Sequence, residues 1–338
     1  MRKSYLHILF AAVLLLAGCT KLEINDKRGE SPISFRPVGR MMTKAILEGS
    51  VFPDDQTFLV GGYYNSSATY FEGLEASSVN VDGVTLWGTD PIMYWPLSGR
   101  LDFIAYSPAN VAAATDATIT VDPADGISAT GYTNDGETDF MYAISTVNDC
   151  DAHPDAVPMT FEHALTQLVI KVKQAQEYTS EISGYSNIVH LTVDDLNLTG
   201  IYNSGNFDQS GSPQWTLTGS TSGSMGLIPT PVGLTYGEDP QMVARSLFIP
   251  QTLLSSAEIN GHYTIHQTIT LNGDYTGETT VEKSWQIPIT VKLADYIATW
   301  QPGYKYIYEL SFGMETIQVS ARTSDWLPAG DEITIEED

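Results

Sequence analysis

Hydrophobic and polar residues alternate along most of the chain in short segments that Gly, Asn, Asp and Pro separate. In the first half this pattern predicts β-strands over residues 33–35, 57–64, 79–87, 93–96, 101–106, 118–121 and 139–143. A spacing of about 8–15 residues with turn residues between the strands is typical of β-sandwiches and barrels. Pro37 favours a sheet edge for the first strand, because proline donates no backbone hydrogen bond. The apolar residues 111–114 are too few for more than one helical turn.

The strands expected in the second half are longer and cover residues 168–173, 189–198, 245–249, 263–271, 279–291 and 304–312. In the last of them, alternate apolar residues share one face, with Ile307 as the exception; they are Tyr304, Tyr306, Tyr308, Leu310 and Phe312. A period of two places one face in a core and the other in water. Residues 205–226 are rich in Gly, Ser and Thr and predict a long surface loop.

The composition changes between residues 149 and 158, where Asp, Ala, His and Pro dominate. We place a domain boundary there, since linkers have such compositions. The sequence therefore predicts an all-β protein with two tandem antiparallel β-sandwich domains, residues 33–155 and 156–338.

The N-terminus carries the pattern of an export signal. Basic residues at positions 2 and 3 precede an apolar core over residues 8–17, and Leu16-Ala17-Gly18-Cys19 follows. That core is about half the length that a bilayer-spanning helix needs. The four residues ending at Cys19 resemble a bacterial lipobox, which implies removal of residues 1–18, lipidation of Cys19 and a tether over residues 19–32. Acyl chains hold such a protein on a membrane. The alternative is an ordinary signal peptide in which the cysteine is accidental.

The charge balance limits the possible partners. With 16 basic against 41 acidic residues the formal net charge is -25, and the surface repels nucleic acid and anionic lipid headgroups. If Cys19 is lipidated, Cys150 has no partner for an intrachain disulfide. Asp149 and Asp151 disfavour its thiolate, so an inert thiol is expected.

Catalytic and cofactor motifs are absent from the sequence: there is no phosphate-binding loop and no nucleophile elbow. His262 and His266 fall in a predicted strand, where about 13 Å separates them, too far for one zinc ion. The acidic residues between 149 and 155 lack the glycine and glutamate of a calcium loop. Carboxylate pairs such as Asp194-Asp195 leave glycosidase chemistry open without singling it out. We expect no enzyme activity, no cofactor and no metal.

A set of aromatic residues admits two interpretations, a platform for stacking sugars or plugs of the hydrophobic core; the set is Tyr63, Tyr64, Trp87, Trp95, Trp215, Trp285, Trp300 and Trp326. Most of them lie at strand ends next to Pro or Gly. Core positions are the commoner role for aromatic residues at strand ends.

Seven segments taken together resemble the fimbrillin (Mfa-like) family, the lipoprotein subunits of type V pili. In chain order they cover residues 94–96, 101–108, 139–143, 161–168, 249–251, 300–306 and 325–326. The first reads Tyr94-Trp95-Pro96, and the last is Asp325-Trp326. Each segment is weak alone, but their order behind a lipobox is specific.

The resemblance implies two transthyretin-like β-sandwich domains and export to the outer membrane as a surface lipoprotein of the fimbrium. It implies that an arginine-specific protease removes the N-terminal segment with the strand at residues 33–35, so that a strand of another pilin subunit fills the groove. Such β-augmentation satisfies an unpaired sheet edge and an apolar groove together. The donor candidate is residues 315–322, in which Ile317 and Val319 can enter the groove. A permanent edge strand of its own domain is the other possible role for this segment.

One segment departs from the family pattern. Many relatives have Thr-Arg-Ala where this chain has Thr43-Lys44-Ala45, and the nearest arginine is Arg40. Processing is therefore expected at Arg40 or Lys44, or not at all. A chain that is not processed would be a pilus anchor or tip protein, with a host or bacterial surface ligand as a possible partner. A monomeric lipoprotein that binds glycans is the rival interpretation.

Overall fold

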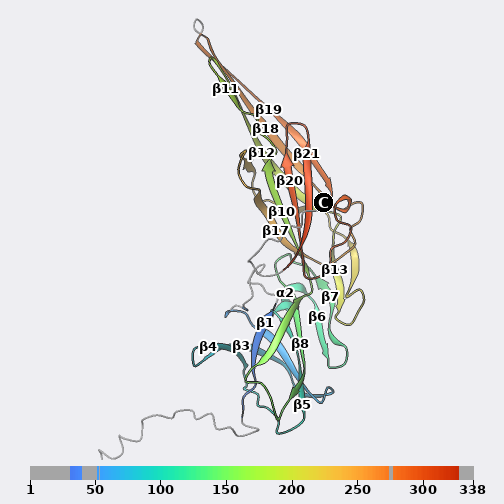
Figure 1. Ribbon diagram of the computed structural model, residues 1–338. Coiled ribbons are helices and arrows are strands. Elements are labelled where there is room, and N and C mark those ends of the chain that lie inside the picture. Colours follow the sequence, from blue (N-terminus) through green and yellow to red (C-terminus); the bar gives the residue numbers. More distant parts are fainter. Residues whose placement is uncertain (1–30, 40–51, 53, 274–276, 327–338) are drawn as a thin grey trace, which may run out of the picture.

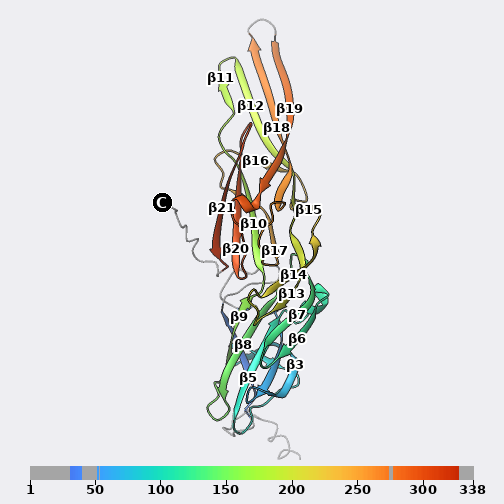
Figure 2. The same cartoon turned by 90° about the vertical axis from the view of Figure 1, so that its right-hand side faces the viewer.

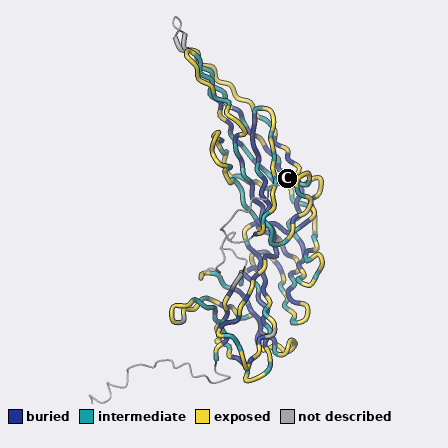
Figure 3. Tube along the Cα trace, in the orientation of Figure 1, coloured by how far each residue is buried: buried dark blue, intermediate teal, exposed yellow. Residues whose placement is uncertain are grey.

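A computed structural model describes residues 31–39, 52, 54–273 and 277–326. The molecule is elongated, with a β-barrel at one end and a long β-hairpin at the other (Figures 1 and 2). Almost all regular structure is strand, so the prediction of an all-β protein is confirmed. Figure 3 shows buried positions running through the barrel and the sheets beyond it, while exposed positions gather at turns and at the outer hairpin.

The N-terminal part forms a closed barrel in the order β1-β4-β3-β2-β5-β8-β9. Its strands are β1 (Ser34–Gly39), β2 (Phe58–Tyr64), β3 (Ala68–Val81), β4 (Val84–Thr89), β5 (Arg100–Ser107), β8 (Met141–Asp149) and β9 (Val157–His163). Between β5 and β8 the chain forms one short helix, α2 (Val111–Thr115), which matches the single turn expected there.

Two details of this barrel correct the sequence prediction. Residues 79–87 are not one strand but the hairpin of β3 and β4, because Asp82 (φ 52°) and Gly83 (φ 84°) form a turn with positive φ at both central positions. Such an Asp-Gly turn is a strong hairpin signal. Strand β1 is also not an edge strand, since it pairs with β4 on one side and β9 on the other. The pairing with β4 ends at Phe35, before Pro37, which explains how the proline is tolerated.

A second, four-stranded sheet joins the two halves of the chain in the order β14-β13-β7-β6. Strands β6 (Thr118–Asp122) and β7 (Gly126–Thr133) come from the first half, and β13 (Tyr202–Asp208) and β14 (Trp215–Thr221) from the second. The prediction of a loop over residues 205–226 is therefore wrong. Phe207 and Trp215 are the reason, since both are buried and fix this Gly- and Ser-rich hairpin to the core.

The core beneath this sheet draws residues from both halves, including Tyr132, Phe140, Leu165 and Leu247. Strands on either side of residue 155 thus share one sheet and one core. The division into two domains at residues 155/156 stays a prediction.

The C-terminal part is a sandwich of two sheets. One has the order β17-β10-β20-β21 and the other is built on β11-β12-β18-β19. The first consists of β10 (Thr166–Gln174), β17 (Gln241–Phe248), β20 (Tyr304–Phe312) and β21 (Ile317–Asp325). The second consists of β11 (Ser180–Ile182), β12 (Tyr185–Thr199), β18 (Glu258–Gly273) and β19 (Gly277–Lys292). Two short strands, β15 (Met225–Gly226) and β16 (Val232–Leu234), also pair with β12. A 3-10 turn, η1 (Leu293–Asp295), follows β19.

The period-two pattern of residues 304–312 has the expected outcome. Tyr306, Tyr308, Leu310 and Phe312 are buried in the sandwich core, and Ile307 is buried on the other face. Among the strand pairs of the described residues, β1–β9 and β10–β20 are parallel and the rest antiparallel. Within the described ranges, no helix is long and apolar enough to cross a membrane.

Candidate functional site

Strand β1 closes the barrel, and it comes from the N-terminal side of the predicted processing segment. It pairs with β9 in parallel from Phe35 opposite Val157 to Gly39 opposite Phe161, and with β4 in antiparallel fashion at Ser34 and Phe35. The backbone of Ile33 donates to the carbonyl of Met93 at 2.8 Å, which extends the pairing toward the N-terminus. Without β1, strands β4 and β9 would each present an unpaired edge.

The side chains of β1 alternate between the barrel interior and the surface. Ile33 and Phe35 are 2% and 0% exposed, and Pro37 is also buried, whereas Arg36 is exposed. Burying one such apolar side chain contributes about 1.5–3 kcal/mol. Three inward positions spaced by two residues therefore make β1 an integral part of the barrel core.

Phe35 lies at the centre of an aromatic cluster. Its ring packs edge-on against Phe58 at 5.9 Å and against Phe103 at 5.3 Å between ring centroids. Phe52, beyond the undescribed segment that follows β1, contacts Phe58, Trp87 and Phe161 in the same cluster. The space that β1 occupies is therefore a groove with aromatic walls and hydrogen-bonding edges.

Strand β21 lies at the edge of a sheet. Among the strands that the structure describes, it is the last of its sheet and pairs with β20, from Ile317 opposite Phe312 to Asp325 opposite Tyr304. Ile317, Val319 and Ala321 are half-buried against the sandwich core, while Gln318 and Ser320 are exposed. Its apolar positions repeat every two residues over the same length as Ile33, Phe35 and Pro37. The structure thus contains the predicted donor segment as an edge strand of its own sheet.

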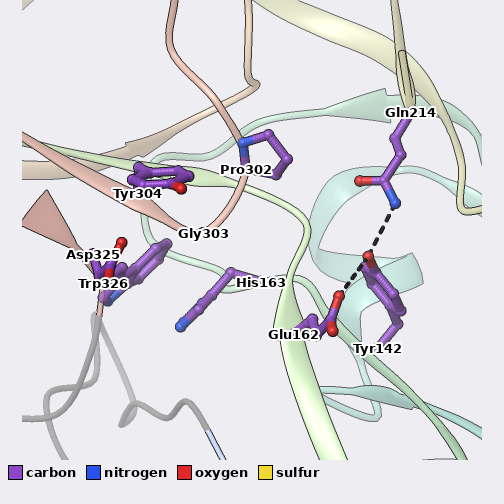
Figure 4. A pocket seen from close by; sticks show the side chains of 9 residues that line it. All are labelled: Tyr142, Glu162, His163, Gln214, Pro302, Gly303, Tyr304, Asp325 and Trp326. Atoms are coloured by element: carbon purple, nitrogen blue, oxygen red, sulfur yellow. Dashed lines mark hydrogen bonds between the residues drawn. The ribbon is translucent and has the colours of Figure 1, made fainter. Parts of the chain in front are cut away.

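A cavity of about 310 Å³ lies where β21 ends against the first half of the chain. The residues around it come from β8, β9, the turn between β13 and β14, the start of β20 with the two residues before it, and the end of β21 (Figure 4). The Tyr142 hydroxyl donates to Glu162 Oε2 at 3.2 Å and accepts from Gln214 Nε2 at 3.0 Å. These bonds tie the hairpin of β13 and β14 to the barrel.

Three of the segments that resemble the fimbrillin family, residues 139–143, 161–168 and 325–326, meet beside this cavity. His163 Nδ1 is 3.0 Å from Asp139 Oδ1, and the imidazole stacks on Trp326 with 3.6 Å between ring centroids and 12° between planes. All three residues are buried. Sequence reasoning marked these residues only through the resemblance. In the structure, the stacking of Trp326 on His163 holds the end of β21 against the end of β9.

The sites predicted at Cys19, Arg40 and Lys44 lie outside the described residues. Gly39, the last residue of β1, is the described residue nearest to Arg40. In register, Gly39 lies opposite Phe161 at the junction of the two halves.

The other candidate sites have ordinary structural environments. His262 and His266 lie exposed on one face of β18, and His262 Nδ1 is 3.1 Å from Asp195 Oδ1. Among the residues that the structure describes, no group of three or more His, Cys, Asp and Glu residues could hold a metal ion. Burial raises the pKa of the Cys150 thiol, and the carboxylates of Asp149 and Asp151 raise it further. Burial is thus the larger reason for the inert thiol that the sequence predicted.

Most aromatic residues serve the core. Trp87, Trp95, Trp215, Trp300 and Trp326 are at most 5% exposed. Trp285 on β19 differs, with 42% of its surface exposed. The interpretation of the aromatic residues as core plugs is therefore confirmed for these five and wrong for Trp285.

Comparison with known proteins identifies the family. A family model described as fimbrillin-like matches residues 47–326. A proposed cell adhesion protein of Bacteroides uniformis has a similar structure, with TM-score 0.54 and 15% identity over 88% of this chain and 100% of that chain. A fimbrial protein of Bacteroides vulgatus is similar with TM-score 0.54 and 14% identity over 87% of this chain and 99% of that one. No curated protein matches the sequence.

Proposed function

Because the chain belongs to the fimbrillin-like family, we propose that it is a structural or adhesive subunit of a type V fimbria on the cell surface. Members of this family are structural proteins, so the chain is not an enzyme. In this proposal the protein is exported as a lipoprotein, acylated at Cys19 and held at the outer membrane. Cleavage after Arg40 or Lys44 then releases it for assembly with other pilin subunits.

The observation that carries the proposal is the position of β1. One strand from the N-terminal side of the cleavage segment closes a barrel that the rest of the chain leaves incomplete between β4 and β9. Its loss would expose the aromatic cluster around Phe58 and Phe103 together with two sheet edges. An extended segment that offers alternating apolar side chains satisfies both at once.

We propose that β21 of a neighbouring subunit supplies this segment. Ile317 and Val319, with Ala321, provide three apolar side chains at the spacing of the three inward positions of β1. Donation requires β21 to leave β20, which breaks nine residue pairs in its own sheet. The new pairs with β4 and β9, together with burial in the aromatic groove, offset that loss.

A disulfide across β1 and β4 tests this proposal. Ser34 lies opposite Gly88 at the start of β1, and a Cβ at Gly88 meets only Val79 Cγ2 and Cγ1 at 3.7 and 4.0 Å. The Ser34→Cys, Gly88→Cys variant should still be cleaved after Arg40 or Lys44, yet keep β1 in place and fail to polymerise. Addition of a reductant should restore assembly.

The single variant Ser34→Cys is the control and should assemble like the unmodified protein. Assembly is measured as SDS-resistant oligomers after cleavage. Polymers that form equally well with the disulfide closed would contradict the proposal. A chain that is never cleaved and never polymerises would instead be an anchor or tip subunit.

A further inference from the structure

The outer end of the C-terminal sandwich carries exposed apolar residues. Strands β18 and β19 reach beyond the rest of the molecule (Figures 1 and 2). Near their tip, Ile182 is 71% exposed, Leu271 49%, Val281 41% and Trp285 42%. Single exposed apolar residues are common on protein surfaces, but a contiguous group of them marks an interaction site.

The pairing of the strands shows that these four residues share one face. On β12, Tyr185 lies opposite Ile182 of β11 on one side and Leu271 of β18 on the other. Between β18 and β19, Ile269 lies opposite Val281, and Ile265 lies opposite Trp285. Paired residues point to the same side of a sheet, and Ile265 is buried in the sandwich core. The four residues therefore lie on the core-facing side of the sheet, at positions that the rest of the sandwich leaves exposed. We call this surface the hairpin face.

The opposite end of the molecule carries a second exposed apolar group. Tyr70, Ile92, Tyr94 and Leu97 are 39%, 59%, 43% and 66% exposed. The Tyr70 hydroxyl donates to the carbonyl of Tyr94 at 2.8 Å, which joins them into one surface. Strand β5 runs from Arg100 to Ser107 just before α2 at the junction of the two halves, so residues 92–97 lie at the far end of the barrel (Figure 1). We call this surface the barrel pole.

The charges on the two surfaces are complementary. Lys283 lies between Val281 and Trp285 and points to the same side, and it is exposed. The barrel pole is flanked by the exposed carboxylates of Asp90, Asp151 and Asp155. His153 stacks on Trp95 with 4.7 Å between ring centroids. This contact holds the segment that carries Asp151 and Asp155 beside the barrel pole.

We propose that the hairpin face of one molecule docks on the barrel pole of a second copy of the same chain. Two different patches at opposite ends of one molecule form a head-to-tail contact, which repeats without closing and builds a filament. This inference rests on the proposed fimbrial function and deepens it. The docking would align successive subunits along the fibre, beside the exchanged strand.

A disulfide between copies tests the contact in the full-length chain. The Leu97→Cys, Val281→Cys variant should give a ladder of covalent oligomers on mild oxidation, because Val281 belongs to the hairpin face on β19 and Leu97 to the barrel pole before β5. The matched control is Leu97→Cys with Glu282→Cys, whose second position points to the other side of β19. At least five times less ladder is expected from the control. Equal ladders, or none from the first pair, overturn the inference.

A charge exchange separates this contact from strand exchange. Lys283→Glu should reduce oligomer formation, and adding Asp151→Lys and Asp155→Lys should restore it, whereas Glu282→Lys should have no such effect. If SDS-resistant polymers form while the Leu97–Val281 ladder is absent, the docking inference fails and the proposed function stands. If the ladder forms and cleaved protein never becomes SDS-resistant, strand exchange fails and docking stands.

Discussion

The barrel and the sandwich solve the problem of sheet edges in different ways. The barrel has no free edge as long as β1 lies between β4 and β9, and its core is a cluster of aromatic rings. The sandwich has a mostly aliphatic core and leaves β21 at the edge of one sheet. The difference teaches that β1 supplies fully buried side chains to the barrel core, whereas β21 supplies only half-buried side chains to the sandwich core.

Sequence distance strengthens this contrast. β1 closes the barrel on β9, more than a hundred residues away in sequence, and the intervening chain forms the rest of the barrel. The sandwich also contains a distant pairing, of β10 with β20, but its edge strand β21 pairs with the strand directly before it, β20. The barrel is thus closed by its most distant strand, which lies on the N-terminal side of the proposed cleavage segment.

The largest expected effect comes from the centre of the barrel. Phe35→Ala should lower the free energy of unfolding of the full chain by about 3–5 kcal/mol, because it leaves a cavity among aromatic rings. Arg36→Ala, on the exposed side of β1, should change it by less than about 0.5 kcal/mol. Denaturant titration measures both. Similar small losses for the two variants would mean that β1 is not part of the core.

A smaller effect is expected where the two regions meet. Trp215 Nε1–H donates to the buried carbonyl of Ala164 at 2.6 Å. Trp215→Phe leaves that carbonyl without its donor and should cost about 1–3 kcal/mol of unfolding free energy. Thr216→Ala, exposed on the same strand, is the control. A neutral Trp215→Phe variant would argue against the shared sheet as a mechanical link between the halves.

Substitutions in the edge strand β21 should lower the stability less than substitutions in the barrel core. Ile317→Ala removes a half-buried side chain, so the loss should be about 1 kcal/mol, below the range for buried isoleucine. Gln318→Ala should be neutral. If β21 is the donor strand, the same Ile317→Ala change should reduce polymer yield far more than it reduces the stability of the monomer. Equal reductions would remove the reason to assign Ile317 to the groove.

The effect expected at Tyr63 appears only at alkaline pH. Burial, with help from the carboxylates of Glu72 and Asp122, raises the pKa of the Tyr63 hydroxyl to about 12. The unfolded chain releases this proton near pH 10, so the stability that Tyr63 contributes is complete below about pH 10 and is lost between about pH 10 and 12. Tyr63→Phe should flatten the fall in melting temperature in that window, and Tyr236→Phe, an exposed control, should not. An unchanged pH profile for Tyr63→Phe would contradict this account.

Several features of the fold could be predicted because they are local. The alternation in residues 304–312 places Tyr308 and Leu310 in the core, and the structure confirms it. The single turn at Val111 follows from the shortness of its apolar tract. Period-two patterns reveal strands and their buried faces without reference to the rest of the chain.

Other features depend on partners that a local pattern does not name. The hairpin of β13 and β14 has the composition of a loop and is held by Phe207 and Trp215, which pack against the first half of the chain. The parallel pairing of β1 with β9 cannot be inferred from alternation, because alternation specifies a face and not a neighbour. The donor candidate follows from the family resemblance and stays a prediction, whereas the contact of Trp326 with His163 required the three-dimensional arrangement.

The most direct test of the central claim, that β1 is a removable plug, is the intact mass and N-terminal sequence of subunits purified from surface fibres. The account predicts chains that begin at Met41 or Ala45 and lack Ser34–Gly39. Fibre subunits that retain acylated Cys19 and the whole of β1 would contradict it, because the barrel groove would then be closed in the assembled fimbria.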